Sequence, residues 1–356
     1  MTAPVSRRSE GGFTIVELLV STAIMITVTG AIFSLLNPAQ GSGQTQPEVA
    51  DMQQRLRVGQ ETLFKELMMA GAGPYQGAST GSLVNFFAPV LPRRTGRVSP
   101  DPTQGAASFR SDAITLAYIP NTYSQTTLSA PMPNVSAELK VNNQPNCPQR
   151  QQLCGFAVGM NVIIFDTTGY FDTFDVTEVQ DAAGHLQHRG QQLNHEYATG
   201  SQVTQIVSNT YYLNRVTNQL MRYDGGDAVG NSEVALVDNV VDLAFQYFGD
   251  PRPPVRPANC VAGMATLVPE DGSLVALTQA ILTDGPYCGS GSNQFDADLL
   301  RVRKVRVQLR VQAAMQSLRG TGALFMKPGT ALGGERYVPD YRVAFDVSPR
   351  NLNLAR

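Results

Sequence analysis

Residues 11–17 of this chain read GGFTIVE, and an apolar run from Leu18 to Leu36 follows them. The run has no charged residue, and in a helix at about 1.5 Å per residue it reaches close to the roughly 30 Å of a bilayer core. Glu17 stands at the mouth of this run, where a carboxylate without a partner is costly. The stretch therefore predicts a membrane-spanning helix whose acidic residue has a function.

Two simpler interpretations compete with this one. An ordinary secretory signal could be cleaved at the small residues of 39–41, but its apolar core is usually only about 7–15 residues long and needs no glutamate. A plain single-span anchor explains the length of the run but not the order of Gly12, Phe13 and Glu17.

The N-terminal pattern resembles the processing site of type IV pilins and their relatives. In that family a basic leader ends in Gly, the mature chain begins with Phe, and a Glu follows in register, as Gly12, Phe13 and Glu17 do here. The resemblance implies that a prepilin peptidase cuts after Gly12 and methylates the new amino group of Phe13. It also implies that Glu17 meets the positive N-terminus of a neighbouring subunit when subunits stack, which would give the carboxylate its partner.

Arg7 and Arg8 precede the apolar run, so the positive-inside rule places the leader in the cytoplasm and the remainder outside. The localisation that follows is a single-pass inner-membrane protein before assembly, then the periplasm and an extracellular pilus. The 356 residues leave room for one large domain or two small ones beyond the anchor. A net charge of −2 provides no global basic field for nucleic acid.

The four cysteines fit an exported protein, because an even number outside the cytoplasm favours two disulfides. Three pairings are possible, and we expect the nearest in sequence, because each pair lies in one segment rich in Pro, Gly and Asn. The absence of a CxxC spacing and of a nearby His argues against zinc. The expected bonds join Cys147 to Cys154 and Cys260 to Cys288.

The chain divides into five expected segments. They are a leader at 1–12, an apolar membrane or filament-core helix at 13–37, a flexible break at 38–47, an amphipathic second half of the helix at 48–73, and a β-rich globular domain at 74–356. The break is predicted because Pro38 lacks an N–H and a Gly-Ser-Gly sequence follows it.

The second half of the helix carries one apolar stripe at steps of three, four and seven residues. The stripe consists of Val49, Met52, Leu56, Leu63, Leu67 and Ala70. Such a face needs a sheet to cover it, and glycines from Gly71 onward predict the end of the helix.

After residue 74 the pattern changes to short β-like runs separated by turn residues. Expected strands lie at 113–119, 158–166, 171–179, 202–213, 219–223, 240–248, 300–311 and 341–347. Near Lys304 the alternation of apolar residues changes phase, which predicts a β-bulge. Residues 120–152 are rich in Pro, Asn and Gln and are expected to form a long irregular insertion.

This layout predicts an α+β, pilin-like fold: a long N-terminal helix whose apolar first half projects, packed on a C-terminal antiparallel β-sheet domain with long loops. It resembles the PilW-type minor pilins, which implies a structural subunit that initiates assembly near the filament tip. The implied partners are other minor and major pilins, the prepilin peptidase, the assembly platform of the inner membrane, and the membrane itself through residues 13–37.

Three alternatives stay open. One is a minor pseudopilin J-like subunit of type II secretion, which shares the architecture. Another is a tip adhesin or DNA-binding module, for which the loops at 120–157 and 249–298 are candidates. The third is an anchored enzyme, but no nucleophile elbow and no phosphate-cradling loop occurs, so we expect neither catalysis nor a cofactor.

Two candidate sites for cations are weighed against simpler explanations. His185, His188 and His195 lie close in sequence and could bind a metal with Asp181 or Glu196, but a solvated hairpin loop explains them better. The DGGD sequence at 224–227 could donate oxygens to calcium, but a turn between strands accounts for the same residues. We therefore expect no metal.

One basic run is present, and it consists of Arg301, Arg303, Lys304, Arg306 and Arg310. It could face DNA, although the sequence offers no further support for this. A solvent-facing edge strand protected by charge is the commoner explanation.

Overall fold

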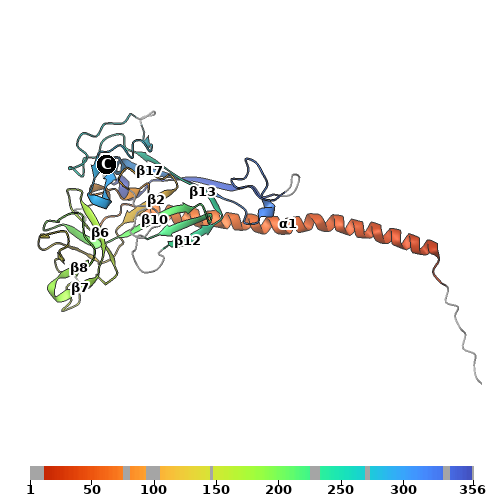
Figure 1. Ribbon diagram of the computed structural model, residues 1–356, viewed down its shortest axis with the longest axis horizontal. Coiled ribbons are helices and arrows are strands. Elements are labelled where there is room, and N and C mark those ends of the chain that lie inside the picture. Colours follow the sequence, from red (N-terminus) through yellow and green to blue (C-terminus); the bar gives the residue numbers. More distant parts are fainter. Residues whose placement is uncertain are drawn as a thin grey trace, which may run out of the picture.

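The structure is a computed structural model that describes residues 12–74, 81–93, 105–144, 147–224, 233–268, 273–331 and 337–354, without the side chains of 35–43. It has an α+β layout, in which a long N-terminal helix leads into a domain of antiparallel strands (Figure 1). The apolar half of the helix projects from the domain, as expected.

Helix α1 runs without interruption from Ile15 to Met69, so the expected flexible break at 38–47 is wrong (Figure 1). A proline inside a helix removes one backbone hydrogen-bond donor and lowers the stability of the helix by about 3 kcal/mol, but this loss is confined to a single turn. Long helical stretches on both sides continue through that turn. The helix ends close to the expected position, with Ala70 as its C-cap and Gly71 at a φ of +78°.

The apolar stripe on the second half of α1 is confirmed. Met52, Leu63, Leu67 and Ala70 are fully buried, while the other two members of the stripe are partly buried. Gly59 also lies against the domain: a Cβ at this position would stand 2.7 Å from the side chain of a buried leucine on strand β17. The helix therefore approaches the sheets closely along this face.

Two sheets form the main body. The five-stranded sheet has the spatial order β1 (Val90–Leu91), β2 (Ala113–Tyr118), β10 (Val207–Asn214), β11 (Gln219–Tyr223) and β12 (Glu233–Asp238). The four-stranded sheet has the order β14 (Val275–Leu277), β13 (Val240–Gly249), β17 (Val302–Val311) and β18 (Tyr341–Val347). Helix α1 packs against β12, β17 and β18, so it covers parts of both sheets.

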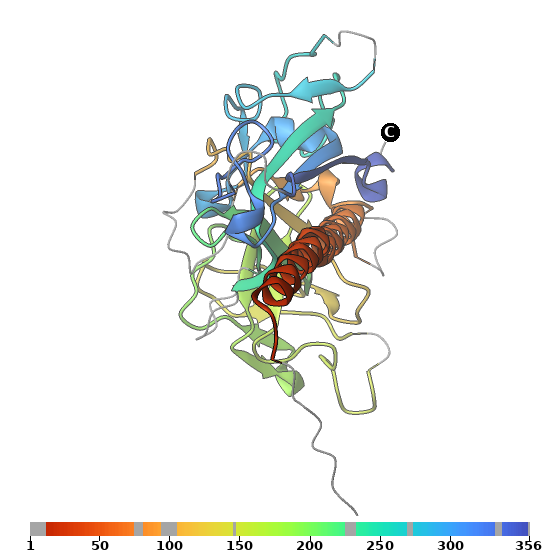
Figure 2. The same cartoon turned by 90° about the vertical axis from the view of Figure 1, so that its right-hand side faces the viewer.

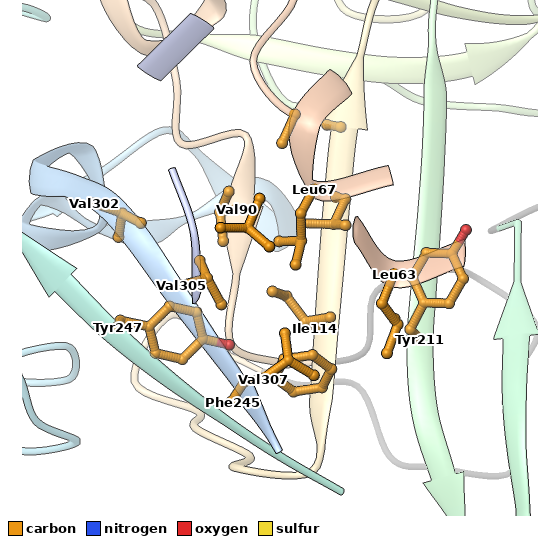
Figure 3. Close-up of a cluster of buried hydrophobic side chains, with 14 of the residues drawn as sticks. Leu63, Leu67, Val90, Ile114, Tyr211, Phe245, Tyr247, Val302, Val305 and Val307 are labelled. Carbon is orange, nitrogen blue, oxygen red and sulfur yellow. The ribbon is translucent and has the colours of Figure 1, made fainter. Parts of the chain in front are cut away.

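The main core fills the space between α1 and these sheets (Figure 3). Leu63 and Leu67 enter it from the helix, Ile114 from β2, and Phe245 and Val307 from the four-stranded sheet. Burying each of these large side chains stabilises the fold by about 1.5–3 kcal/mol. The helix and the two sheets are thus held by one continuous core.

The predicted bulge in the late basic strand is confirmed. Phe248 pairs with Lys304 while the next residue, Gly249, pairs with Val302, which leaves Arg303 as the extra residue on β17. The extra residue restores a single buried face, because Val302 and Val305 are both buried on either side of it.

Residues 119–206 form an inserted lobe between β2 and β10, which are themselves paired neighbours in the main sheet. Its strands are β3 (Gln125–Thr127), β9 (Gln202–Gln205), β5 (Asn161–Phe165) and β6 (Phe171–Asp175) in one sheet, and β4 (Leu139–Lys140), β8 (His185–Gln187) and β7 (Glu178–Gln180) in a second. The lobe lies on one side of α1 and the four-stranded sheet on the other (Figure 2).

The inserted lobe corrects the expectation of an irregular insertion at 120–152. That segment contributes β3, β4 and four fully or nearly fully buried side chains to a second core: Leu128, Met132, Leu139 and Val141. The expected strands at 171–179 and 202–213 each divide between two sheets. The alternation of apolar and polar residues predicted that these residues form extended strands. It did not predict the residue at which the chain passes from one sheet to the other.

The remaining elements are short. They are β15 (Tyr287–Cys288), β16 (Phe295–Asp296), α2 (Arg350–Asn353) and the 3-10 helices η1 (Leu83–Asn85), η2 (Asp181–Ala183), η3 (Gly291–Asn293), η4 (Ala297–Arg301) and η5 (Gln316–Leu318).

Candidate functional site: the projecting helix and the polar clusters

Residues 15–34, the first part of α1, are exposed to solvent in the isolated chain. Residues 15–34 form a stretch with a mean hydropathy of 2.0 of which no part is buried against the domain, and within the described residues it is the one helix long and apolar enough to cross a membrane. Ile15, Met25 and Ile26 are each at least 70% exposed. An apolar helix that is this exposed in the isolated chain fits a membrane span or a signal sequence.

Three of the five hydroxyl groups within this stretch donate to carbonyls of the same helix. The Thr22 hydroxyl donates to the carbonyl of Leu18 at 2.9 Å, and the Thr27 hydroxyl donates to that of Ala23 at 2.8 Å. Ser34 bonds a carbonyl of its own helix in the same way. Polar groups bonded inside the helix need no water, so these residues are compatible with an apolar surrounding.

Glu17 closes a capping box with Thr14 at the start of α1. Its Oε2 accepts from the Thr14 backbone N–H at 3.0 Å and from the Thr14 hydroxyl at 2.9 Å. The Glu17 backbone N–H in turn donates to the Thr14 hydroxyl oxygen at 3.2 Å. The carboxylate therefore has partners within its own helix, whereas the sequence alone suggested that it lacks them before assembly. No described residue bonds its second oxygen, Oε1.

Gly12 and Phe13 precede the helix in an open position. Phe13 is 86% exposed, and no atom of another residue lies within 4 Å of a Cβ built at Gly12. The peptide bond between them is thus accessible in the isolated chain. The leader arginines and Gly11 lie outside the described residues.

The cysteines come together in the two expected pairs. Cys147 and Cys154 are at disulfide distance on the inserted lobe, with Cα atoms 5.6 Å apart. Cys260 and Cys288 form the second pair with Cα atoms 5.1 Å apart, beside the four-stranded sheet. The first pair is partly exposed and the second is buried.

The three histidines do not form one solvated loop. His185 lies 3.0 Å from a carboxylate oxygen of Glu138, whereas His188 is only 3% exposed. His195 stacks on Tyr170 with ring centroids 3.9 Å apart. None of the three belongs to a cluster of metal-ligating side chains in the described ranges. The DGGD turn at 224–227 lies outside the described residues except for its first aspartate.

The basic run does not mark a sheet edge, because β17 lies between β13 and β18. Arg301 and Arg303 are buried, and the Arg301 guanidinium donates to the carbonyls of Pro251 and Ala265 at 2.7 and 2.6 Å. Arg301 therefore holds two loops in place, and Arg303 donates to the nearby carbonyls of Leu300 and Val302.

The other three cations of the run are paired with carboxylates. Arg306 makes two bonds to Asp346, at 2.6 and 2.9 Å, and Lys304 lies 3.4 Å from the same group. Arg310 donates to a carboxylate oxygen of Asp340 at 2.9 Å. A strand neutralised in this way presents little net charge to a polyanion.

One acidic cluster was not anticipated as a site. Asp284, Asp296 and Asp298 place carboxylate oxygens within 4.8 Å of one another, and within the described ranges they are the one such group that could hold a metal ion. The cluster already has a cation, because the Arg301 Nε lies 2.5 Å from Asp298. Burial nevertheless raises the pKa of Asp298 to about 6.

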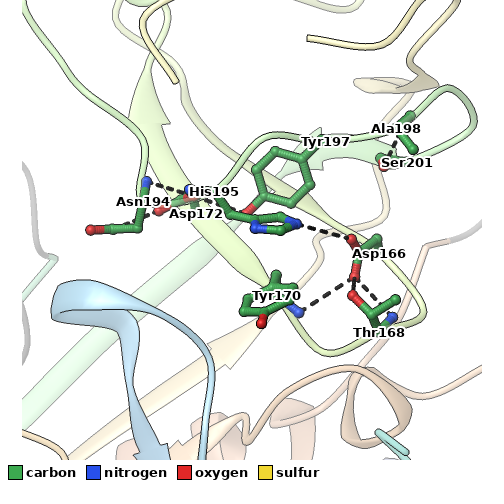
Figure 4. Close-up of polar contacts among 9 residues, drawn as sticks. All are labelled: Asp166, Thr168, Tyr170, Asp172, Asn194, His195, Tyr197, Ala198 and Ser201. Carbon is green, nitrogen blue, oxygen red and sulfur yellow. Dashed lines mark hydrogen bonds and ion pairs between the residues drawn. The ribbon is translucent and has the colours of Figure 1, made fainter. Parts of the chain in front are cut away.

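A polar network around Asp172 lies within the inserted lobe (Figure 4), and one bond from Asn293 connects it to the main body. This buried carboxylate accepts bonds from the Tyr197 hydroxyl at 2.9 Å, from the backbone and side chain of Asn194, and from the His195 backbone. Asn293 of η3 adds a further bond at 2.7 Å. Burial raises the pKa of Asp172, and the hydrogen bonds oppose that shift. No sequence motif marks these residues, since they come from three separate segments.

No known protein family, curated protein or solved structure matches the chain.

Proposed function

We propose that this protein is a pilin-like minor subunit of a type IV pilus system, anchored in the inner membrane through residues 13–37 and later carried into a filament, where it helps to initiate assembly near the tip. The observation that supports this proposal is the bare apolar half of α1, which has no contact with the domain. A bilayer surrounds such a helix before assembly, and the helices of other subunits surround it afterwards.

The start of the helix distinguishes this proposal from a plain anchor. Glu17 uses one carboxylate oxygen to cap its own helix, so Oε1 is available for the N-terminal amine of a neighbouring Phe13. In an apolar filament core, two unpaired charges are very costly, whereas a paired one adds little net stability. We therefore assign the Glu17 pair the role of setting subunit register. The capping bonds orient the carboxylate for that contact.

The test uses Glu17→Gln, which keeps an acceptor oxygen for Thr14 and removes the charge. In a strain that lacks the native copy, we expect the variant to be cleaved and inserted normally but to give fewer filaments and to co-purify weakly with partner subunits. Glu61→Gln is the matched control, because Glu61 is an exposed helical residue paired only with Arg57 among the described residues. Normal filament number and normal co-purification for Glu17→Gln would contradict the proposed role.

Processing provides a separate test. Gly12→Val should leave the leader attached, because the peptidase needs a small residue beside the scissile bond, and mass spectrometry of the unmodified protein should find N-methyl-Phe13 at its start. A mature chain that begins near Ser42 would instead identify an ordinary signal peptide and refute the pilin interpretation.

A second candidate, a binding module at the filament tip, is favoured by the inserted lobe. The lobe has its own core and lies away from the projecting helix (Figure 1). Its residues 119–206 include three Lys or Arg and seven Asp or Glu, a formal charge of −4, which disfavours DNA as its ligand. Binding assays with the full chain, compared with a variant in which the lobe is replaced by a short turn, separate this role from a purely structural one. A pseudopilin J-like role predicts co-purification with secretion subunits instead.

A further inference from the structure

His188 is buried in the inserted lobe with a backbone carbonyl at each ring nitrogen. Its Nδ1 lies 2.7 Å from the Gln191 carbonyl oxygen, and its Nε2 lies 2.8 Å from that of Ala137. The side chain is 3% exposed, and the ring packs against Phe174 with centroids 5.4 Å apart. Water therefore has little access to either nitrogen.

Both neighbours of the ring are acceptors, and this fixes the number of ring protons. A neutral imidazole has one N–H and one lone pair, so it could satisfy only one carbonyl and would direct its lone pair at the other oxygen. The imidazolium donates from both nitrogens, and charged donors make the stronger hydrogen bonds. The arrangement thus suits the doubly protonated ring alone.

We propose that His188 is a proton-dependent clasp, which is closed when the ring is an imidazolium and opens when it loses a proton. The clasp joins two irregular segments, residues 132–137 and 188–197. The Met132 N–H donates to the Tyr197 carbonyl at 2.9 Å, and the Leu193 N–H donates to that of Val135 at 3.1 Å. Each segment depends on the other for its backbone partners, so loss of the ring proton loosens both.

The charged groups beside the ring are paired with one another. His185 lies on β8, which ends one residue before His188, and it pairs with Glu138, the residue after Ala137. Arg189 follows His188 directly and is paired with Glu178 of β7 at 2.7 Å. The cation that neighbours His188 in sequence thus already has a carboxylate partner.

Strand β6 contributes Asp175, whose backbone is held by the Gln191 side chain through two bonds of 2.9 and 2.8 Å. The lobe as a whole carries the formal charge of −4 given above, so its net charge does not oppose an added proton. Gln191, whose carbonyl is one of the two acceptors of His188, is thus fixed to strand β6 by its own side chain.

Hydrogen exchange of the full-length protein in detergent tests the clasp. The peptide that spans residues 129–141 is followed by mass spectrometry at pH 6, 7 and 8, with exchange rates corrected for their intrinsic pH dependence. Opening releases one proton, so the opening constant of this segment should rise towards tenfold per pH unit.

His188→Gln should exchange faster at pH 6 and lose the pH dependence, because a neutral amide has no proton to release in this range. His185→Gln is the matched control, and its exchange should keep the pH dependence of the unmodified protein. A change of less than twofold between pH 6 and pH 8 in the unmodified protein overturns the proposal, and this result does not depend on whether a variant folds. An unchanged slope in His188→Gln overturns it as well.

Discussion

Replacing Gly59 by alanine should destabilise the protein, although alanine is normally the better helix residue. In an exposed helix interior the change gains about 1 kcal/mol from propensity, and a buried methyl adds roughly 0.8 kcal/mol. Here the new Cβ would lie 2.7 Å from Cδ2 of Leu309, which is fully buried on β17. Overpacking costs typically about 1–3 kcal/mol, and the upper end applies because Leu309 pairs with strands on both sides.

The net loss for Gly59→Ala is therefore about 1 kcal/mol, and its sign should depend on Leu309. In a Leu309→Val background the clashing Cδ2 atom is absent, so the same Gly59→Ala change should stabilise by about 2 kcal/mol, the sum of the propensity and methyl contributions. Urea unfolding of the four proteins in detergent measures this coupling. If Gly59→Ala stabilises the unmodified protein as much as the Leu309→Val protein, the helix does not approach β17 as closely as described.

Further predictions concern the disulfides and pH. In the chain-entropy model, the Cys147–Cys154 disulfide stabilises the folded state by about 2.5 kcal/mol. The Cys260–Cys288 disulfide contributes about 3.6 kcal/mol, because it closes the longer loop. Single Cys→Ser variants should unfold at correspondingly lower urea, with the larger shift at Cys260; the reverse order would contradict the entropic account. Asp298 has a pKa raised to about 6, so the folded state holds an extra proton between about pH 4 and 6 and stability falls as pH rises through that window. Thermal unfolding should give a higher midpoint at pH 5 than at pH 7, and a midpoint that increases with pH would show that Arg301 keeps this carboxylate ionised in the folded protein.

Sequence patterns predicted those features that depend on local order. The phase change near Lys304 located the bulge, because a strand with one buried face must absorb an extra residue there. The apolar stripe on α1 predicted which face packs on the sheets. The cysteine pairing followed from short separations within turn-rich segments.

Features that depend on contacts distant in sequence were not predictable in this way. The strength of a proline as a helix breaker was overestimated at Pro38, because the flanking stretches continue the helix. The second core was missed because Leu128 and Met132 lie in a polar, proline-rich segment with no sustained alternation. The bonds around Asp172 come from three segments, so only folding brings them together.

The attachment of the inserted lobe determines how the molecule would bear mechanical load. Both ends of the lobe leave the main sheet side by side, at the pair formed by Tyr118 and Val207. A pull on the lobe against an anchored α1 therefore draws β2 and β10 in the same direction. The load then acts as shear on the hydrogen bonds that join β2 to β1 and β10 to β11. The hydrogen bonds between β2 and β10 carry almost none of it. If the lobe unfolds under this load, residues 119–206 extend as a doubled chain by roughly 145 Å at about 3.3 Å per residue, slightly less with the small loop closed at Cys147. A chain built in this way would extend at its lobe under tension while α1 and the two main sheets stay packed together.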